Sequence, residues 1–409
     1  MPKLILSAIG DICLARSMPA LIAKNGDDYP FENVQKSFDK SDILFGNLES
    51  VYKPDYFPKE NANEHFQSLN SSPDLKRILV DAGFDVINQA TNHALDCGLE
   101  GLKYTYKVLE NSGFTVIGAG ETEKIASSMK VIEKKGTKIG FLGYTDSICF
   151  TLEGGNGCLS YFQKEKVLES IKQNKDKVDI LIVSWHADIE FANAPSIPRY
   201  DACHEMIDAG ANAIICHHPH VPQGVEEYKD GVILYSLGNF LFDTGPYQKK
   251  HNPIDSLRTF IFNLEIENKK ITGWNREYFK IIREECRPEP LNNEELKEFE
   301  KHFEKIDELV KERNKVRKEW HRISKYWFNE YWDKLPLNNA DEFLNNISRN
   351  TFYLIPNLME GIADIAKSKY SEFKNTTLDW DRPFSIFEKS ASKEILTLGN
   401  PNLATISKK

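Results

Sequence analysis

Apolar runs of strand length alternate with amphipathic segments of helix length along the first two thirds of the chain. The strand-like runs are Leu4–Ile9, Ile43–Phe45, Val86–Asn88, Val116–Ile117, Ile139–Leu142, Ile180–Ser184, Ala213–Ile215 and Val232–Tyr235. The helix-like segments between them are Pro73–Ala82, Leu99–Asn111, Lys164–Asn174 and Arg199–Ala209. This repeated order of strand, helix and strand predicts a layered α/β core.

The pattern changes towards the carboxyl end. Arg258–Glu267 and Ile271–Ile282 flank a short polar turn and predict an antiparallel hairpin. The Pro-containing stretch Arg287–Asn293 predicts a boundary. Glu294–Ser324 and Tyr326–Tyr370 then have the spacing of helices. We therefore predict a domain of residues 1–286 and a helical C-terminal extension of residues 287–409, which packs on the core or on a second subunit as a homo-oligomer.

Composition narrows the class of protein. The net charge of −9 argues against a nonspecific nucleic-acid binder. The seven cysteines show no CxxC spacing and are typical of reduced thiols in a reducing compartment. The amino-terminal sequence enters a strand at once, and no apolar run approaches the length of a membrane span. We expect a soluble, cytoplasmic protein.

Several predicted strands end in side chains of types that can bind metals. These side chains are Asp11, Asn47 and Glu49, Asn92, His93 and Asp96, His186 and Glu190, His217, His218 and His220, and Asn239 and Asp243. A single His at a strand end is usually a hydrogen-bonded, partly buried residue. The pair His218 and His220 favours metal binding over this structural role, because alternate residues of an extended chain project to one side. Ligands of α/β sheets bind at the carboxyl ends of the strands. The sequence therefore predicts a metal site there.

Carboxylates, an amide and imidazoles together form a mixed nitrogen and oxygen set. Such a set suits Mn, Fe, Zn or Mg, and no group of thiolates requires structural zinc. We expect one or two divalent ions, with Mn as the first choice.

Seven motifs carry a resemblance to a known family. In order they are GDICLAR, FGNLES, ATNHALDCG, VIGAG, HADIEF, DAGANAIICHHPH and YSLGNFLFD, between Leu4 and Asp243. With them the chain resembles the CapA family of poly-γ-glutamate capsule synthesis proteins, a branch of the calcineurin-like metallophosphoesterase superfamily. The resemblance implies a four-layer α-β-β-α sandwich with metal ions at the loops of one edge, followed here by the helical region.

The resemblance also implies roles for individual residues. The metal ligands would be Asp11, Glu49 as the carboxylate that bridges two ions, Asn92, His186, His218 and His220. His93 would donate a proton, and Asp96 could hold its ring. Glu190 is a further acid–base candidate. The candidates for substrate binding are Arg16, Asn47, His217 and Asn239.

The chain departs from the family pattern at three positions. Cys13 stands where the superfamily has a His ligand, and it is either a ligand or, by its usual behaviour, a buried apolar residue. Asp188 stands at the Gly position of a His-Trp-Gly-x-Glu motif, and Cys216 replaces the Gly before the double His. CapA proteins are commonly tethered to a membrane, whereas we expect no anchor segment here.

Three functions remain open from the sequence. The first is a metal-dependent hydrolase of a phosphoester, in which the ion activates water and His93 protonates the leaving oxygen. The second is chemistry on a peptide or on polyglutamate, such as amide hydrolysis, transfer or epimerisation, with His93 and Glu190 as the acid–base pair. The third is a non-catalytic scaffold that binds a polyanion or a partner protein.

Overall fold

The computed structural model describes residues 2–55, 68–146, 158–243 and 254–332, with only the backbone for residues 325–332. The chain forms two compact units, Met1–Val316 and Arg317–Lys409. The fold and the site described below belong to the first unit. Of the predicted helical region Tyr326–Tyr370, the part beyond Trp332 lies outside the described residues.

The first sheet contains the amino-terminal strands and the hairpin. Its order is β16 (Arg287–Pro290), β15 (Lys270–Ile282), β14 (Arg258–Glu267), β1 (Leu4–Ile12), β2 (Ile43–Leu48), β5 (Val86–Asn88) and β6 (Thr115–Ile117). The strands β1, β2, β5 and β6 run parallel, so their carboxyl ends lie at one edge. Where β14 stops pairing with β1, β13 (Asn239–Leu241) takes its place beside Asp11 and Ile12.

The second sheet is built around four parallel strands. Its order is β11 (Val225–Tyr228), β12 (Gly231–Leu234), β10 (Ala213–His217), β9 (Ile180–His186), β8 (Thr137–Thr145) and β7 (Lys130–Lys134). The strands β12, β10, β9 and β8 are parallel, whereas β11 and β7 are antiparallel edges. A separate short pair is formed by β3 (Val51–Tyr52) and β4 (Asn70–Ser71).

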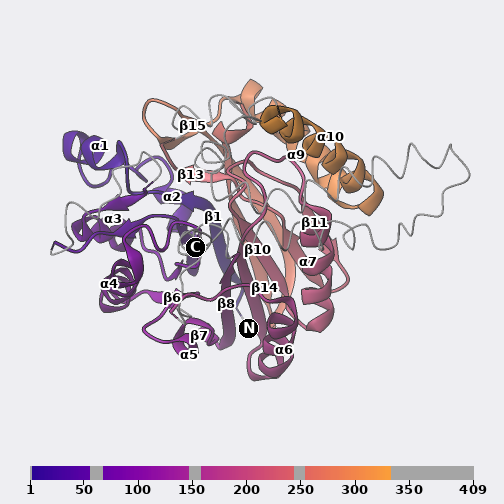
Figure 1. The fold of residues 1–409 in the computed structure, drawn as a ribbon, viewed down its shortest axis with the longest axis horizontal. Coiled ribbons are helices and arrows are strands. Elements are labelled where there is room, and N and C mark those ends of the chain that lie inside the picture. Colours follow the sequence, from indigo (N-terminus) through magenta and orange to yellow (C-terminus); the bar gives the residue numbers. More distant parts are fainter. Residues whose placement is uncertain (1, 56–67, 147–157, 244–253, 333–409) are drawn as a thin grey trace, which may run out of the picture. The chain divides into compact units, whose positions relative to one another are not determined.

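Helices cover the outer faces of both sheets (Figure 1). Beside the first sheet lie α1 (Met18–Asn25), α2 (Gln35–Phe38), α3 (Lys76–Asp81) and α4 (Gly98–Asn111), and beside the second lie α6 (Lys164–Asn174) and α7 (Ile197–Ala209). The short α5 (Glu123–Ala126) lies between β6 and β7 in the chain.

Alternation along the strands separates two cores. Leu4, Leu6 and Ala8 of β1 belong to the core between the two sheets, whereas Ile9 and Ile12 belong to the core under the helices of the first sheet. The two-residue period of a strand sends Ile9 to the face opposite Ala8, and the register shift between Ala8 and Asp11 brings Ile12 to the same face as Ile9. The predicted four-layer α/β sandwich is therefore confirmed.

The carboxyl end of the first unit is part of the sandwich. The helix α9 (Asn293–Val310) begins with a capping box at Asn292 and Glu295 and is followed by α10 (Arg313–Trp332). Phe303 and Ile306 of α9 lie in the core between the sheets. The close fit depends on Gly224, since a Cβ there would lie 2.3 Å from the carbonyl oxygen of Ile306.

The predicted elements differ from the observed ones mainly at the edge strands of the sheets. All of the predicted strands are present, and the hairpin is β14 and β15. The Pro-containing stretch that begins at residue 287 forms the edge strand β16 of the first sheet. The domain boundary between residues 286 and 287 stays a prediction, while the first compact unit itself continues to Val316.

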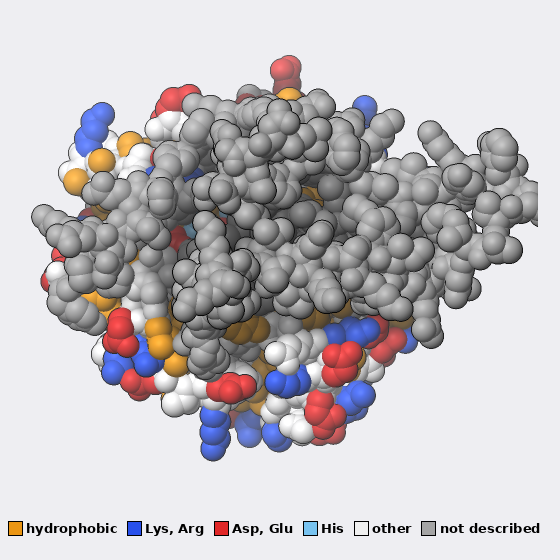
Figure 2. Space-filling view, viewed as in Figure 1, with side chains coloured by type: hydrophobic (Ala, Val, Ile, Leu, Met, Phe, Trp, Pro, Cys, Tyr) orange, Lys and Arg blue, Asp and Glu red, His pale blue; other side chains and the backbone are white. Residues whose placement is uncertain are grey.

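The surface is charged and mixed. Figure 2 shows Lys, Arg, Asp and Glu side chains interspersed over the described surface on one face. Among the described residues, no helix combines the length and the apolar character that a bilayer span requires.

Candidate metal centre

The carboxyl ends of strands from both sheets converge at one place. On the first sheet, Asp11 lies opposite both Asn47 and Asn239 in the pairing of β1 with β2 and β13. On the second sheet, His186 lies opposite His217 in the pairing of β9 with β10. The two sheets face each other through the inner core, so these strand ends meet across it. The predicted convergence at the sheet edge is therefore present in the structure.

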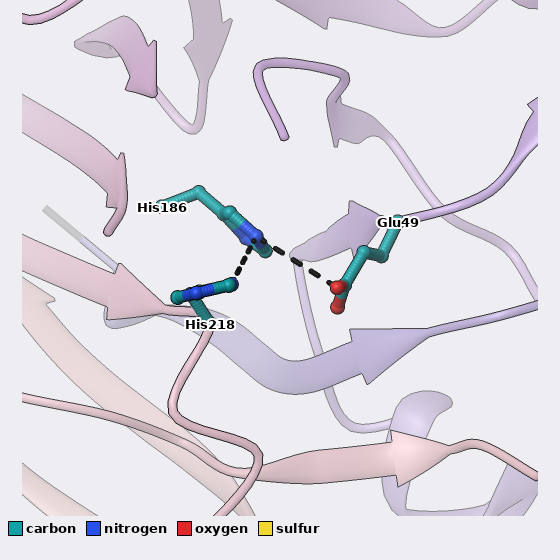
Figure 3. Close-up of side chains that lie close together, drawn as sticks. All are labelled: Glu49, His186 and His218. Atoms are coloured by element: carbon teal, nitrogen blue, oxygen red, sulfur yellow. Dashed lines mark hydrogen bonds and ion pairs between the residues drawn. The ribbon is translucent and has the colours of Figure 1, made fainter. Parts of the chain in front are cut away.

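One group of ligand atoms comprises Glu49, His186 and His218, all buried (Figure 3). The Nδ1 atom of His218 lies 3.2 Å from Nε2 of His186, which lies 3.9 Å from Oε1 of Glu49. Oδ1 of Asn92 lies 2.9 Å from the same Nε2 atom. Two atoms bound to one cation at about 2.1 Å are about 3.0–3.4 Å apart. The separations of Nε2 of His186 from His218 and Asn92 suit a shared ion, whereas Oε1 of Glu49 lies somewhat farther away.

A second group shares Glu49 with the first and adds Asp11 and His220. Oδ2 of Asp11 lies 3.4 Å from Nδ1 of His220, whose Nε2 lies 3.5 Å from Oε1 of Glu49. A third group joins His218 and His220 with Glu190, which is partly exposed. Glu49 therefore lies where one carboxylate can serve two neighbouring cations.

Several buried oxygens at this place accept no hydrogen bond from the described residues. They are both carboxylate oxygens of Glu49 and Oδ2 of Asp11. Buried polar atoms nearly always have a partner, because an unpaired one costs the lost hydration. A divalent cation would satisfy these oxygens together with the imidazoles, and the oxygen and nitrogen donors fit Mn, Fe, Zn or Mg.

The charges of these buried side chains shift one another's pKa values. Burial raises the pKa of Glu49 to about 8. Burial favours neutral His220, but the charges of Glu49 and Asp11 outweigh it and raise the pKa of His220 to about 10. Burial also acts to raise the pKa of Asp11, yet the neighbouring imidazoles of His217 and His220 hold that pKa well below its ordinary value. Burial lowers the pKa of both His186 and His218, which favours the neutral imidazoles that bind metals.

Asn47 and His217, predicted to bind substrate, lie behind the ligands. Nδ2 of Asn47 donates to Oδ1 of Asp11 at 2.9 Å and lies 3.1 Å from Nδ1 of His186. Nδ1 of His217 lies 3.1 Å from the same Asp11 oxygen, and its ring packs beside Phe45. Both side chains are fully buried. These contacts orient Asp11 and His186, which are predicted metal ligands, and a role of Asn47 and His217 in substrate binding stays a prediction.

Asn88 is a member of this network that the sequence analysis missed. Its Nδ2 donates to Oδ1 of Asn47 at 2.7 Å. The available signal was a polar residue at the end of an otherwise apolar, buried strand.

His93 and Asp96 form a pair at the rim of the site. Nδ1 of His93 lies 2.8 Å from Oδ2 of Asp96, and this oxygen also accepts from the backbone N–H of Leu69. Nε2 of His93 is directed to the site, 3.9 Å from Oε1 of Glu49. Burial favours the neutral ring, but Asp96 and then Glu49 raise the pKa of His93 above its ordinary value. The predicted contact between His93 and Asp96 is present.

The two remaining candidates for substrate binding lie beside the second group. Oδ1 of Asn239 lies 2.9 Å from Nδ1 of His220. Arg16 donates to the carbonyl oxygen of Asp243 at 2.9 Å, and its guanidinium lies 5.8 Å from the ring centre of Phe242, which is next to His220.

Two local expectations need revision or refinement. His218 and His220 have φ values of 96° and 58°, so the expected extended conformation of this segment was wrong. Both rings nevertheless reach the same site, as predicted. Cys13 is fully buried with Ala15, Leu69 and Phe242, and burial raises its pKa to about 12. Its surroundings are those of an apolar residue.

Comparisons with known proteins agree with the motifs. The family described as "Bacterial capsule synthesis protein PGA_cap" matches residues 5–244. The "Capsule biosynthesis protein CapA" of Bacillus anthracis is 34% identical over 254 residues, which are 59% of this chain and 61% of that protein. The "PGA biosynthesis protein CapA" of Bacillus subtilis (strain 168) is 33% identical over 247 residues, which are 58% and 63% of the two chains. The chain thus matches about three fifths of the length of these relatives.

Solved structures offer more distant likenesses. A hypothetical protein from Thermus thermophilus is 13% identical with a TM-score of 0.44, covering 68% of this chain and 99% of that chain. The 5′-nucleotidase of Candida albicans is 10% identical with a TM-score of 0.39, covering 69% and 53%. Because both TM-scores are below 0.5, the fold described above rests on its own sheet order and cores. The family match covers more than half of the sequence, and the chain belongs to the bacterial capsule synthesis protein family PGA_cap.

Proposed function

We propose that this chain is a metal-dependent hydrolase that acts on a phosphoester. The observation that supports it most is the pair of ligand groups that share Glu49. The first ion would be held by Glu49, Asn92, His186 and His218, and the second by Asp11, Glu49 and His220. Mn is the first choice, with Fe, Zn and Mg as alternatives.

The cations would supply Lewis-acid stabilisation of charge that gathers on phosphorus and would activate the attacking water. His93 supplies the acid. Its Nδ1 is held by Asp96, which leaves Nε2 directed to the site and able to donate a proton to the leaving oxygen. Such a contribution is typically about a hundredfold or more in rate.

Other side chains fix the geometry of the reaction. Asn47 and His217 orient Asp11, and Asn239 orients His220. Arg16, beside Phe242, would bind the anionic group of the substrate. A cytoplasmic location and self-association through the C-terminal helices remain predictions from the sequence.

A second candidate is chemistry on polyglutamate or another peptide. It is favoured by the name of the relative from Bacillus subtilis, a PGA biosynthesis protein. The partly exposed Glu190 beside His218 and His220 would then act with His93 as an acid–base pair. Loss of deuterium from the α-carbon, or new amino termini, on incubation with a γ-linked glutamyl peptide would support this candidate over phosphoester hydrolysis.

The proposed function is tested by metal analysis and turnover together. Freshly purified protein is expected to contain a divalent transition metal, and an aryl phosphodiester should be hydrolysed with added Mn²⁺ and not with excess chelator. The His93→Ala variant should lose about a hundredfold in turnover with unchanged metal content.

The matched control is His204→Ala. His204 is another partly buried His with a carboxylate partner, since its Nε2 lies 2.9 Å from Oε2 of Glu226 on β11. Its removal should leave turnover within about twofold. Loss of bound metal in His93→Ala would contradict the acid role, and a metal-free, inactive wild type under every metal condition would leave only the interpretation as a binding scaffold.

A further inference from the structure

Behind the ligands, α7 carries a fully buried cation, Arg199. Its Nη2 donates to the carbonyl oxygen of His217 at 3.2 Å, and its Nη1 lies 3.5 Å from Oδ2 of Asp188. The guanidinium lies 5.9 Å from the ring centre of Trp185. Arg199 therefore joins the ends of β9 and β10, the two strands that carry the His ligands.

Its partner, Asp188, is held in a conformation that does not suit an aspartate. Asp188 lies two residues beyond His186, is buried, and has a φ of 88°. Glycine adopts this region without a steric cost, whereas a residue with a Cβ is strained there. The carboxylate also accepts from the backbone N–H of Ser196 at 2.7 Å, at the start of α7. A strained, buried Asp needs a compensating use for its carboxylate.

The peptide between His217 and His218 is the point on which the pair acts. The carbonyl oxygen of His217 accepts from the N–H of Ala187 at 3.1 Å and from Arg199. These two bonds fix the plane of this peptide. The next residue, His218, has a φ of 96°, and its Nδ1 lies 3.2 Å from Nε2 of His186. The direction of the His218 ring thus depends on a peptide that Arg199 holds in place.

Stability alone does not explain this ion pair. A buried pair loses hydration on both sides, and well-packed apolar residues of the same size are often as stabilising. Nε and Nη1 of Arg199 make no hydrogen bond with the described residues, so the pair is not optimised for hydrogen bonding.

We propose that Asp188 and Arg199 are positioning residues that hold the His217–His218 peptide and thereby set the affinity of the site for a divalent cation. The inference rests on the proposed metal site. It assigns a purpose to the strained Asp at position 188: the carboxylate orients the guanidinium, and the guanidinium orients the ligand loop.

The test compares Mn²⁺ affinity with stability for Arg199→Met, Arg199→Lys and Asp188→Asn. The dissociation constant is measured from the free Mn²⁺ signal in electron paramagnetic resonance, and the urea midpoint is measured in chelator. Loss of groups that orient metal ligands commonly weakens binding about 10–100-fold. Arg199→Met and Asp188→Asn should each weaken Mn²⁺ binding at least about tenfold, and Arg199→Lys should retain part of the affinity because it keeps the charge.

The double variant Asp188→Gly/Arg199→Met separates positioning from folding. It removes both charges and the strain at position 188, so its urea midpoint should exceed that of Arg199→Met, while its Mn²⁺ affinity should stay low. If affinity recovered along with the midpoint, the pair would act only through stability and the inference would be wrong.

Arg276 provides the matched control. It forms another largely buried pair, with Nη1 and Nη2 at 2.8 and 2.6 Å from the carboxylate of Asp307 on α9. Arg276→Met should lower the urea midpoint and leave Mn²⁺ affinity within about twofold.

Failure of this inference differs from failure of the proposed function. Wild-type affinity in folded Arg199→Met and Asp188→Asn would overturn the positioning role while the metal site stands. A wild-type protein that binds no Mn²⁺ or other divalent ion would overturn both. If Arg199→Met does not fold, Asp188→Asn, which keeps the size of the side chain, decides the question.

Discussion

Replacing Glu49 should stabilise the metal-free protein while it abolishes the response to metal. Glu49 is fully buried, and neither carboxylate oxygen accepts a hydrogen bond from the described residues. Methionine has a similar length and no strong hydrogen-bonding group, and it adapts to irregular space. Glu49→Met therefore removes a buried polar group at little cost in packing.

The size of the effect follows from the two oxygens. An unsatisfied buried acceptor costs about 1–3 kcal/mol, so two of them cost roughly 2–6 kcal/mol. The loss of the contact with His220 reduces the gain, but His220 keeps its contacts with Asp11 and Asn239. We expect the free energy of unfolding in chelator to rise by about 2 kcal/mol, the lower end of this range.

With bound metal, the wild type should become more stable than the Glu49→Met variant. At free metal of 100 times the dissociation constant, a bound ion stabilises the folded state by about 2.7 kcal/mol. The wild type should gain this amount, whereas Glu49→Met should gain almost none because both ligand groups contain Glu49. The assay is urea denaturation followed by fluorescence, with chelator and then with increasing Mn²⁺.

Glu226→Met is the control, and it should change the free energy of unfolding in the opposite direction. Glu226 is also a buried carboxylate, but its Oε2 lies 2.7 Å from the hydroxyl of Tyr235 and 2.9 Å from Nε2 of His204. Glu226→Met leaves these groups without their partner and should destabilise the protein by about 1–3 kcal/mol, with or without metal. A Glu49→Met protein that is less stable than wild type in chelator, or that gains the full stabilisation from Mn²⁺, would refute the reasoning.

Three further changes test the fold and the site. Cys13→Ala should leave the metal content per chain unchanged, as measured by elemental analysis, because the thiol lies among apolar side chains; a proportional loss of metal would make it a ligand. Asn292→Ala should destabilise the first unit by about 1 kcal/mol in urea, since it removes the side chain that accepts from Glu294 and Glu295 at the start of α9. Gly224→Ala should cost about 1–3 kcal/mol, because its Cβ would meet the backbone of Ile306, and Mn²⁺ affinity should not change; an unchanged urea midpoint would contradict the close packing of α9.

The sequence predicted the convergence of the site because the relevant strands are apolar until they end. A buried run that stops at Asp11 or His186 places that residue at the carboxyl edge of its sheet, whatever the loops do. The same reasoning identified Glu49, which follows β2 directly. This prediction required only that the strands run in the same direction, which follows from the helices that connect them.

The local backbone conformation at the site and the burial of the residues behind it were harder to predict from the sequence. The positive φ of His218 and His220 depends on contacts with distant segments and leaves no mark in the local sequence. The burial of His217 against Phe45 depends on how the two sheets face each other. The edge strand β7, KVIEK, is short and mostly exposed, so it lacks the continuous apolar character of the inner strands.

The prolines of β16 have a consequence for assembly. Pro288 and Pro290 have no N–H to donate. Proline suits an outermost strand such as β16 at positions where the missing N–H would point away from the neighbouring strand. The carbonyl oxygen of Pro288 instead lies 3.5 Å from the side-chain amide of Asn33. The exposed margin of the first sheet beside the hairpin therefore offers a poor template for a strand from another molecule, which protects a crowded solution of this protein from edge-to-edge aggregation.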